Sequence, residues 1–299
     1  MTRTDGMAGF SPGLMALLVL MALGWGLNWP IMKMVISEVP PLSFRGFCLV
    51  FGGLGLLLLA RLGGQALGPP AGKWPVLAWL ALTNILGWNV LTIYGVSYLP
   101  SGRAALLGYT MPVWSMLLSA LWLGNRLTLR RWLGLTLGGI GVLAMMGMEL
   151  QHLAGVPMGV LLMLGAAWSW ALGVVSLKRF PITMAPMALT GWLMLLGGAP
   201  AALAALVLEL PRWHWPSLWP ALGLVYNVFV AFMFCYWAWN RIVLQVPVAV
   251  ASLSSLLTPL IGVLGGMYLL GEQPGWGEFI GAACILGAVA SVILPERRA

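Results

Sequence analysis

The feature that most constrains this chain is its succession of long apolar runs separated by short polar links. The hydrocarbon core of a bilayer is about 30 Å thick, and a helix needs about 20 residues to cross it. Cutting the chain at charged residues, prolines and polar clusters leaves ten such runs: 12–36, 41–61, 74–97, 102–123, 130–148, 156–178, 185–208, 217–240, 248–270 and 276–294. Short links force consecutive helices to run antiparallel. The sequence therefore predicts an all-α polytopic membrane protein with ten transmembrane helices.

The composition excludes a water-soluble globule. Hydrophobic residues make up 61% of the 299 residues and charged residues only 7%, whereas a soluble domain carries about 25% charged residues. The isoelectric point near 9.9 does not indicate a nucleic-acid-binding protein, because the basic residues are scattered between apolar runs and form no patch. We expect the lipid bilayer to surround the chain, and no nucleic-acid partner.

The basic residues predict the orientation. If the N-terminus is cytoplasmic, eleven of the 15 Lys and Arg residues lie at cytoplasmic ends of spans. Cytoplasmic loops of membrane proteins carry such an excess of Lys and Arg. The prediction is a multi-pass protein of a bacterial-type inner membrane, with both tails (residues 1–11 and 295–299) in the cytoplasm.

Neither the cysteines nor the acidic residues form a pattern typical of a metal site or an active site. Cys48, Cys235 and Cys284 lie inside apolar runs, where a free Cys is a small buried hydrophobe. The sole Asp is Asp5 in the N-terminal tail, and all seven carboxylates lie in tails or near span ends. No catalytic set can be assembled within the membrane. We therefore expect no disulfide, metal, cofactor or catalytic residue, and a chain that is not an enzyme.

The chain carries an internal repeat. A shift of 147 residues superimposes prolines and glycines of the two halves: Pro100 on Pro247, Pro112 on Pro259, Gly124 on Gly271 and Gly134 on Gly281. The first repeat is predicted over residues 12–148 and the second over 156–294, joined by a periplasmic link at 149–155. Because each half has an odd number of spans, the second half enters the membrane from the opposite side. Such inverted-topology repeats are typical of secondary transporters, with a substrate site near the midplane between the halves.

These motifs resemble the drug/metabolite transporter superfamily, EamA type, over both repeats. The residues that carry the resemblance are Trp25-Gly26, Lys33, Pro41-Leu42, Arg45, Pro112, Leu123-Gly124, Leu127-Thr128 and Gly134 in the first repeat, and Pro259, Gly271-Glu272 and Gly281 in the second. The family's Gly-Glu pair stands at Gly271-Glu272, but the first half has Gly124-Asn125. The resemblance implies two EamA repeats and export of a small molecule. The abundance of Trp is similar to the branch that exports aromatic amino acids.

Prolines inside the spans indicate where the site lies. Pro112 and Pro259 lie near the centres of their spans at matched positions, and Pro30 lies in the first span. Each removes a backbone donor and frees a carbonyl, which in lipid must face protein or a water-filled cavity. These prolines either interrupt helices around a transport cavity or only set helix shape for packing.

Polar and aromatic side chains within the spans complete the predicted site. Amides, phenols and hydroxyls are costly in hydrocarbon unless partnered, so they should point inwards. They either bond neighbouring helices or line the cavity. A Trp within a span packs against other helices, faces lipid or lines the cavity. We predict a central substrate pocket lined by Trp25, Asn28, Asn84, Trp88, Tyr109, Trp168, Tyr226, Asn227 and Ser254, with Pro30, Pro112 and Pro259 interrupting the helices.

Three basic residues near the outer span ends bear on the cargo. Lys33, Arg45 and Arg103 either extend to the lipid headgroups or form a positive rim that receives a carboxylate. A neutral, aromatic cavity suits neutral amino acids, aromatic ones above all, or organic cations of drug type. A sugar phosphate fits less well, because no Lys or Arg is predicted near the midplane.

The positions of the acidic residues and histidines bear on how transport is coupled to energy. Proton-coupled transporters commonly carry the proton on an intramembrane Asp, Glu or His, and none is visible in the spans. The sequence predicts downhill flux or exchange, unless Glu38, Glu272 or a less usual group carries the proton. A non-transporting membrane scaffold is the alternative from a different class of protein.

Overall fold

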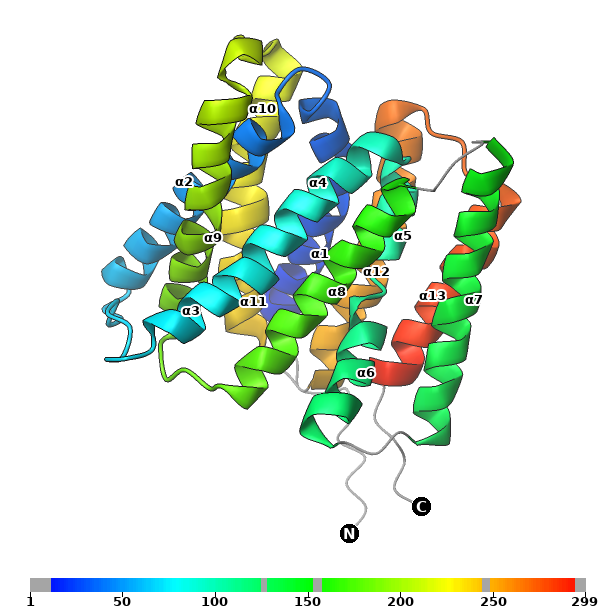
Figure 1. Ribbon diagram of the computed structural model, residues 1–299, viewed down its shortest axis with the longest axis horizontal. Coiled ribbons are helices and arrows are strands. Elements are labelled where there is room, and N and C mark those ends of the chain that lie inside the picture. Colours follow the sequence, from blue (N-terminus) through cyan, green and yellow to red (C-terminus); the bar gives the residue numbers. More distant parts are fainter. Residues whose placement is uncertain (1–11, 125–127, 153–157, 244–247, 294–299) are drawn as a thin grey trace.

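The computed structural model describes residues 12–124, 128–152, 158–243 and 248–293 (Figure 1). Within these ranges, the side chains of residues 130–131, 145–152, 243, 248–256 and 292–293 lie outside the description. All elements of the described ranges are helices, which confirms the predicted all-α class. Figure 1 shows most of them running between the same two ends of one bundle.

The helices follow the predicted spans closely. The first half contains α1 (Pro12–Val35), α2 (Pro41–Leu62), α3 (Trp74–Leu80), η1 (Ala81–Gly87), α4 (Trp88–Tyr98), α5 (Ser101–Gly108), α6 (Met111–Leu123) and α7 (Leu129–His152). The second contains α8 (Met158–Arg179), α9 (Pro186–Leu208), η2 (Leu210–Arg212), α10 (Leu218–Tyr226), η3 (Asn227–Phe234), α11 (Cys235–Val243), α12 (Val248–Leu270) and α13 (Trp276–Ile293). One span in each half is built in the same way: α3, η1 and α4 form one continuous span, and α10, η3 and α11 form its counterpart.

Length and hydropathy agree with a membrane location. In the described residues, seven helical segments are long and apolar enough to cross a bilayer, and shorter apolar helices cover Trp132–Ala144, Leu257–Leu270 and Trp276–Ser291. These segments fall on the ten predicted spans. The predicted polytopic membrane fold is therefore confirmed.

The largest difference from a predicted boundary is at the end of α7. This helix continues to His152, past the expected end at Met148. Residues 149–152 include no Pro or Gly, so nothing stops the helix there. The helix therefore extends into the predicted 149–155 link, and the rest of that link lies outside the described residues.

Matched glycines end matched helices. Gly124 follows α6 and Gly271 follows α12, with φ of 68° and 67°. This left-handed conformation is readily adopted only by glycine and ends a helix with a sharp change of direction. The repeated Leu-Gly motif is therefore a helix stop in both halves.

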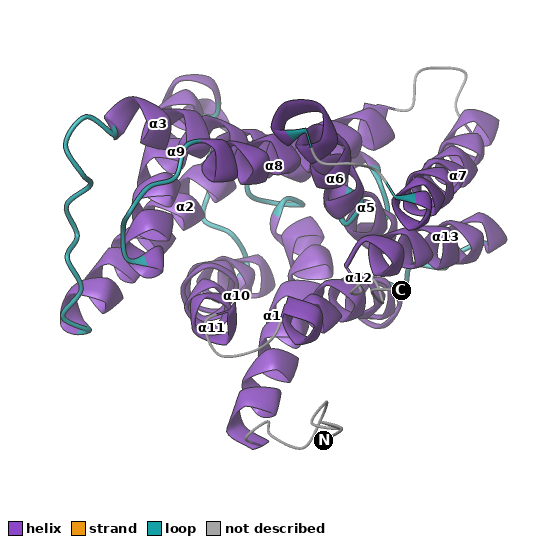
Figure 2. Ribbon diagram, turned by 90° about the horizontal axis from the view of Figure 1, so that it is seen from below, coloured by secondary structure: helices purple, strands orange, loops and turns teal. Residues whose placement is uncertain are grey.

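The two halves interlock along their helices. Helix α2 packs along α9, its counterpart in the other half, and α7 packs along α13. Close approach requires glycine: a Cβ on Gly46 would lie 2.6 Å from Ala202 Cα, and one on Gly198 would lie 2.7 Å from Leu49 Cβ. Small residues of this kind let membrane helices pack closely. Figure 2, seen from below, shows α1, α10 and α11 from opposite halves around the middle of the bundle.

Candidate functional site

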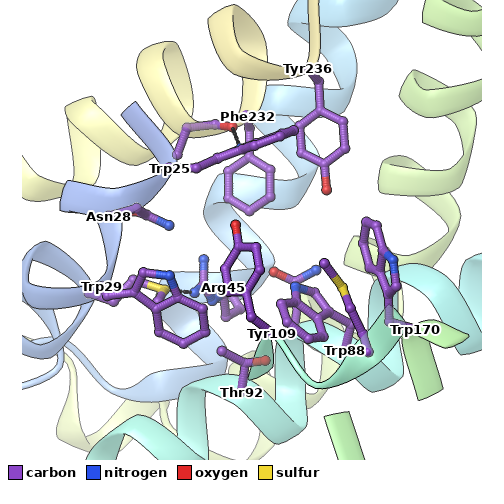
Figure 3. Close-up of a pocket in the computed structure, with 14 residues that line it drawn as sticks. Trp25, Asn28, Trp29, Arg45, Trp88, Thr92, Tyr109, Trp170, Phe232 and Tyr236 are labelled. Carbon is purple, nitrogen blue, oxygen red and sulfur yellow. Dashed lines mark hydrogen bonds between the residues drawn. The ribbon is translucent and has the colours of Figure 1, made fainter. Parts of the chain in front are cut away.

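A cavity of about 100 Å³ lies in the middle of the bundle (Figure 3). It continues into a second cavity of about 570 Å³, which is in the range of small-molecule sites, about 300–1,000 Å³. Helices of both halves supply its walls. The lining residues are Trp25, Asn28, Trp29 and Met32 of α1, Arg45 of α2, Trp88, Asn89 and Thr92 of α4, Tyr109 and Met111 at the α5–α6 break, Trp170 of α8, Ala231 and Phe232 of η3, and Tyr236 of α11.

Aromatic rings form most of the wall and contact one another. Trp88 lies edge-on to Trp29 at a centroid distance of 6.5 Å, and it lies 5.3 Å from Trp170. On the other side, Tyr236 lies 5.4 Å from Trp25 and is nearly parallel to Phe232 at 6.2 Å. Such edge-to-face and offset pairs fix the ring orientations. Figure 3 shows the two groups facing each other across the cavity.

Two π-helical segments occupy equivalent spans of the two halves. Segment η1 leads into Trp88, and η3 carries Phe232 and leads into Tyr236. The wider turns leave carbonyls for partners from the other half: Thr83 O accepts from Ser169 Oγ at 2.6 Å, and Ala231 O accepts from Trp25 Nε1 at 3.0 Å. π-Helical turns often mark functional sites, and here each one orients an aromatic wall of the cavity.

Most of the predicted site residues lie in or near this cavity, and Trp168 does not. Trp25, Asn28, Trp88 and Tyr109 line it. Asn84 lines the second cavity, and donates to Trp170 O at 3.3 Å. Trp168 is 39% exposed on the outside of α8, where it packs edge-on against Trp114.

Three further predicted residues have other surroundings. The Tyr226 hydroxyl donates to Gly24 O at 2.7 Å and joins α10 to α1. Asn227 is buried; its Nδ2 donates to Gly223 O at 3.0 Å, and its Oδ1 accepts from Arg45 Nη1 at 3.4 Å. Ser254 lies in α12, at a position whose side chain is outside the described part of the structure.

Only one of the three predicted prolines stands at a helix break. Helix α5 ends at Gly108 and α6 begins at Met111, with Pro112 in its first turn. This break places Tyr109 at the cavity. Pro30 and Pro259 lie inside α1 and α12, which continue past them. A proline removes a single helical hydrogen bond, and a helix can bend there without ending.

Arg45 is a cavity residue that the sequence did not place there. The side chain is 2% exposed and lines the cavity, although it was expected at the outer rim. This corrects the expectation of a cavity without Lys or Arg. The missed signal is that Arg45 lies only about one turn inside α2 and is long enough to extend inward as well as outward.

The cavity opens toward one end of the bundle. The second cavity, of about 570 Å³, shares Trp25, Tyr109 and Trp170 with it, and continues past Leu177 to Ile182 in the link between α8 and α9. The basic residues Lys178, Arg179 and Arg241 lie near the helix ends on this side.

Carboxylates close the opposite end by holding the first turns of helices. Glu272 accepts from Ser101 N at 2.7 Å and from Ser101 Oγ at 2.8 Å. Glu209 accepts from Ser43 N at 2.7 Å, and Glu38 from Ser217 N at 2.6 Å. Each contact joins one half to the other, and negative charge stabilises a helix N-terminus.

The predicted rim cations also pair at this end. Arg103 forms a buried salt bridge with Glu278, with Nε donating to Oε1 at 3.0 Å. Lys33 donates to Leu99 O and lies 3.9 Å from Glu272. Glu272 is thus engaged in helix contacts and an ion pair, and Glu38 in a helix contact. We call the three contacts of Glu38, Glu209 and Glu272 the Glu–Ser contacts.

A polytopic bundle of two interlocked halves around a central cavity defines a membrane transporter. Comparison with known families agrees: residues 13–147 and 157–294 each match the EamA-like transporter family. The chain belongs to this family, which confirms the two predicted repeats. Membership indicates a transporter rather than an enzyme.

Known relatives are similar over much of their length. The chain is 25% identical to the uncharacterised transporter YoaV of Bacillus subtilis, covering 90% of this chain and 92% of that protein. It is 29% identical to a probable amino-acid metabolite efflux pump of Salmonella typhimurium, with 93% of each covered. The uncharacterised transporter YvbV of Bacillus subtilis is 38% identical, but over 56% of this chain and 53% of that protein. A crystal structure with 21% identity matches with a TM-score of 0.65 over 92% of this chain and 95% of that one, which shows the fold.

Proposed function

We propose that this chain exports small neutral or aromatic metabolites, amino acids first, across a bacterial-type inner membrane by alternating access. The observation that carries the proposal is the central cavity, whose walls hold Trp25, Trp29, Trp88 and Trp170. Stacking on such rings favours flat apolar groups. The name of the Salmonella relative, an amino-acid metabolite efflux pump, supports both the cargo and the direction.

The two ends of the cavity support alternating access. The open end carries Lys178, Arg179 and Arg241, and the preference for basic residues at cytoplasmic ends makes it the cytoplasmic end. The structure then corresponds to a state that loads cargo from inside. Release outside requires the Glu–Ser contacts to separate and the open end to close.

Organic cations are the second candidate cargo. Trp faces attract cations, but the guanidinium of Arg45 in the same cavity repels them. In low dielectric, two like charges within a few ångströms are strongly unfavourable. Neutral amino acids therefore fit the cavity better than drug-type cations. A scaffold without transport would have no use for a cavity between its two halves.

The positions of the acidic residues support transport that is not coupled to a proton. Glu38, Glu209, Glu272 and Glu278 lie at the closed end, where they hold helix N-termini or basic side chains. None of the residues that line the described cavity is an Asp, Glu or His. We propose exchange or downhill flux as the transport mode.

Transport by the purified protein in liposomes tests the proposal. Labelled Trp, Phe, Tyr, a branched-chain amino acid and an organic cation are assayed with and without a protonophore. The expected result is flux of the aromatic amino acids that persists with the protonophore. No flux above empty liposomes for the whole panel would contradict transport, and flux abolished by the protonophore would contradict the coupling mode.

A further inference from the structure

Three buried polar atoms without a hydrogen-bond partner gather around the central cavity. They are Arg45 Nε, Asn28 Oδ1 and Thr92 Oγ1, and all three residues line the cavity. In the described part of the chain, only one other buried side-chain atom lacks a partner, in a link far from the cavity. Buried polar groups are nearly always hydrogen-bonded, so a cluster of unpartnered ones calls for an explanation.

The surroundings of Arg45 leave its charge unbalanced. Its Nη1 donates weakly to Asn227 Oδ1 at 3.4 Å, and its Nη2 contacts Met32 Sδ. The guanidinium carbon lies 4.8 Å from the ring centroid of Phe44 and 5.8 Å from that of Phe232. Among the described residues no carboxylate pairs with it.

An unpaired buried charge is expensive, because it loses hydration without gaining a counter-ion. Arg103 shows the ordinary solution in this chain, since its charge is balanced by Glu278. The cavity around Arg45 is the remaining place from which a negative group can come. A single guanidinium balances one unit of negative charge, which suits a carboxylate and not a dianionic phosphate.

The other two unpartnered atoms point to the rest of the cargo. Asn28 offers a carbonyl oxygen, which accepts hydrogen bonds, and Thr92 a hydroxyl, which donates or accepts. Figure 3 draws Asn28 on one side of the cavity, Arg45 in its middle and Trp88 with Trp170 on the far side. An ammonium group near Asn28 and a flat ring packed against the tryptophans on the cavity side fit this arrangement.

Resting on the proposed transport function, we infer that Arg45 receives the carboxylate of the cargo and Asn28 its ammonium group. The cavity then selects aromatic α-amino acids and discriminates against amines that lack a carboxylate. Arg45 is the specificity-determining residue, and its repulsion of unpaired cations excludes drug-type amines.

Ligand-induced stabilisation of the purified full-length protein tests the inference. The probes share an indole ring: L-tryptophan has both charged groups, indole-3-propionate only the carboxylate, and tryptamine only the amine. At equal concentration, a probe that binds more tightly raises the thermal unfolding midpoint further. For the wild type we expect L-tryptophan to bind best, and indole-3-propionate to bind at least about tenfold better than tryptamine.

Two substitutions of Arg45 and one control separate recognition of the carboxylate from a structural role of this residue. Arg45→Gln should weaken L-tryptophan about tenfold to a hundredfold and abolish the preference for indole-3-propionate over tryptamine. Arg45→Lys keeps the charge and should keep part of the preference. Arg103→Gln is the matched control, because it removes a buried Arg outside the cavity. It should lower stability but leave the preference intact.

The outcomes are distinguishable from those of the transport assay. Equal binding of tryptamine and indole-3-propionate to the wild type, or an unchanged preference in Arg45→Gln, would overturn the inference while aromatic transport stands. A carboxylate preference that depends on Arg45 supports the inference, even if the protein shows no flux in liposomes. In that case the proposed transport fails and the recognition site remains.

Discussion

Glu38, Glu209 and Glu272 each hold the first turn of a helix that belongs to the other half. Each carboxylate bonds both the backbone N–H and the hydroxyl of one serine: Ser217, Ser43 and Ser101 respectively. These three contacts therefore hold the two halves together at the closed end.

Glu272→Gln tests one of these contacts. The amide keeps an acceptor for Ser101 but loses the charge that favours the helix N-terminus and pairs with Lys33. We expect a loss of about 1 kcal/mol, as for a helix-capping residue, and a thermal midpoint lowered by a few degrees in detergent. Flux without a proton gradient should persist.

Ser97→Ala is the control for Glu272→Gln, because the Ser97 hydroxyl bonds only to Tyr94 O in its own turn. It should leave the thermal midpoint unchanged. Transport lost in Glu272→Gln while the fold is intact would mean that Glu272 carries a proton.

The Glu38 contact predicts a pH dependence. Hydrogen bonds from the Ser217 hydroxyl and then from the Ser217 backbone lower the pKa of the Glu38 carboxyl. A carboxyl with a lowered folded-state pKa adds stability above its unfolded-state pKa, about 4.3 for Glu, and loses it as the pH falls through the folded-state value. Thermal midpoints of the wild type and Glu38→Gln should therefore differ at about pH 6 and converge as the pH falls below about 4. A difference independent of pH would contradict this contact.

At the scale of elements, the π-helical segments η1 and η3 are the parts that orient the cavity walls. Each accepts a hydrogen bond from the other half, through Thr83 O or Ala231 O. Gly87 ends η1 beside Ser169, where a Cβ would lie 2.1 Å from Ser169 Oγ. The contact between η1 and α8 therefore depends on a glycine.

Gly87→Ala should destabilise this contact by about 1–3 kcal/mol, as overpacking does. Ser169→Ala removes the hydroxyl that the new methyl group would meet, so the double variant should lose less than the sum of the two single losses. Gly165→Ala on α8 is the control, because its Cβ would meet only Leu91 Cδ1 at 3.4 Å. Denaturation of the purified variants gives the four values. Strict additivity would mean that Gly87 and Ser169 do not touch.

The spans could be predicted from the sequence. Which side of each helix faces the cavity could not. Run length and charge placement fix where a helix crosses the bilayer, which is why predicted and observed spans agree. Because the apolar residues surround each helix, no polar face shows which side points inward. Trp168 and Trp170 illustrate this: they lie two residues apart, and only Trp170 lines the cavity. The π-helical turns likewise leave no mark in a uniformly apolar run.

Part of the site could be predicted from the sequence, because a polar residue within a membrane span has few possible roles. Asn28 and Tyr109 were predicted in the cavity for that reason, and both line it. Arg45 was not predicted there. Its distance from the end of the span gives its depth in the membrane, but not the direction in which its side chain points. Its position depends on the packing of α2 against η3 across the halves, which is long-range information.

At the scale of the whole molecule, two inverted halves enclose one cavity that is open at one end. Inverted halves can exchange their conformations, which would close the open end and open the other. The orientation of the protein in the membrane decides from which compartment the cargo enters the cavity. If the end with Lys178 and Arg179 is cytoplasmic, the structure is the loading state of an exporter.

Accessibility of introduced cysteines tests the orientation. In a variant without native cysteines, Gln151→Cys should react with a membrane-impermeant maleimide in intact cells, because it lies at the predicted outer side. Ala299→Cys should react only after permeabilisation. Reaction of both residues in intact cells, or of both only after permeabilisation, would contradict an odd number of spans between them.

Counterflow of labelled L-tryptophan by Trp88→Ala and Trp168→Ala tests the central claim, that the cavity between the halves is the transport site. Both residues lie in spans and pack edge-on against another Trp, Trp88 at 5.3 Å and Trp168 at 5.5 Å. Only Trp88 lines the cavity. Loss of one stacking ring should lower the apparent affinity of Trp88→Ala about tenfold, while Trp168→Ala stays within about twofold of the wild type. Equal losses in the two variants, at equal expression and stability, would show that the cavity is not where the cargo binds.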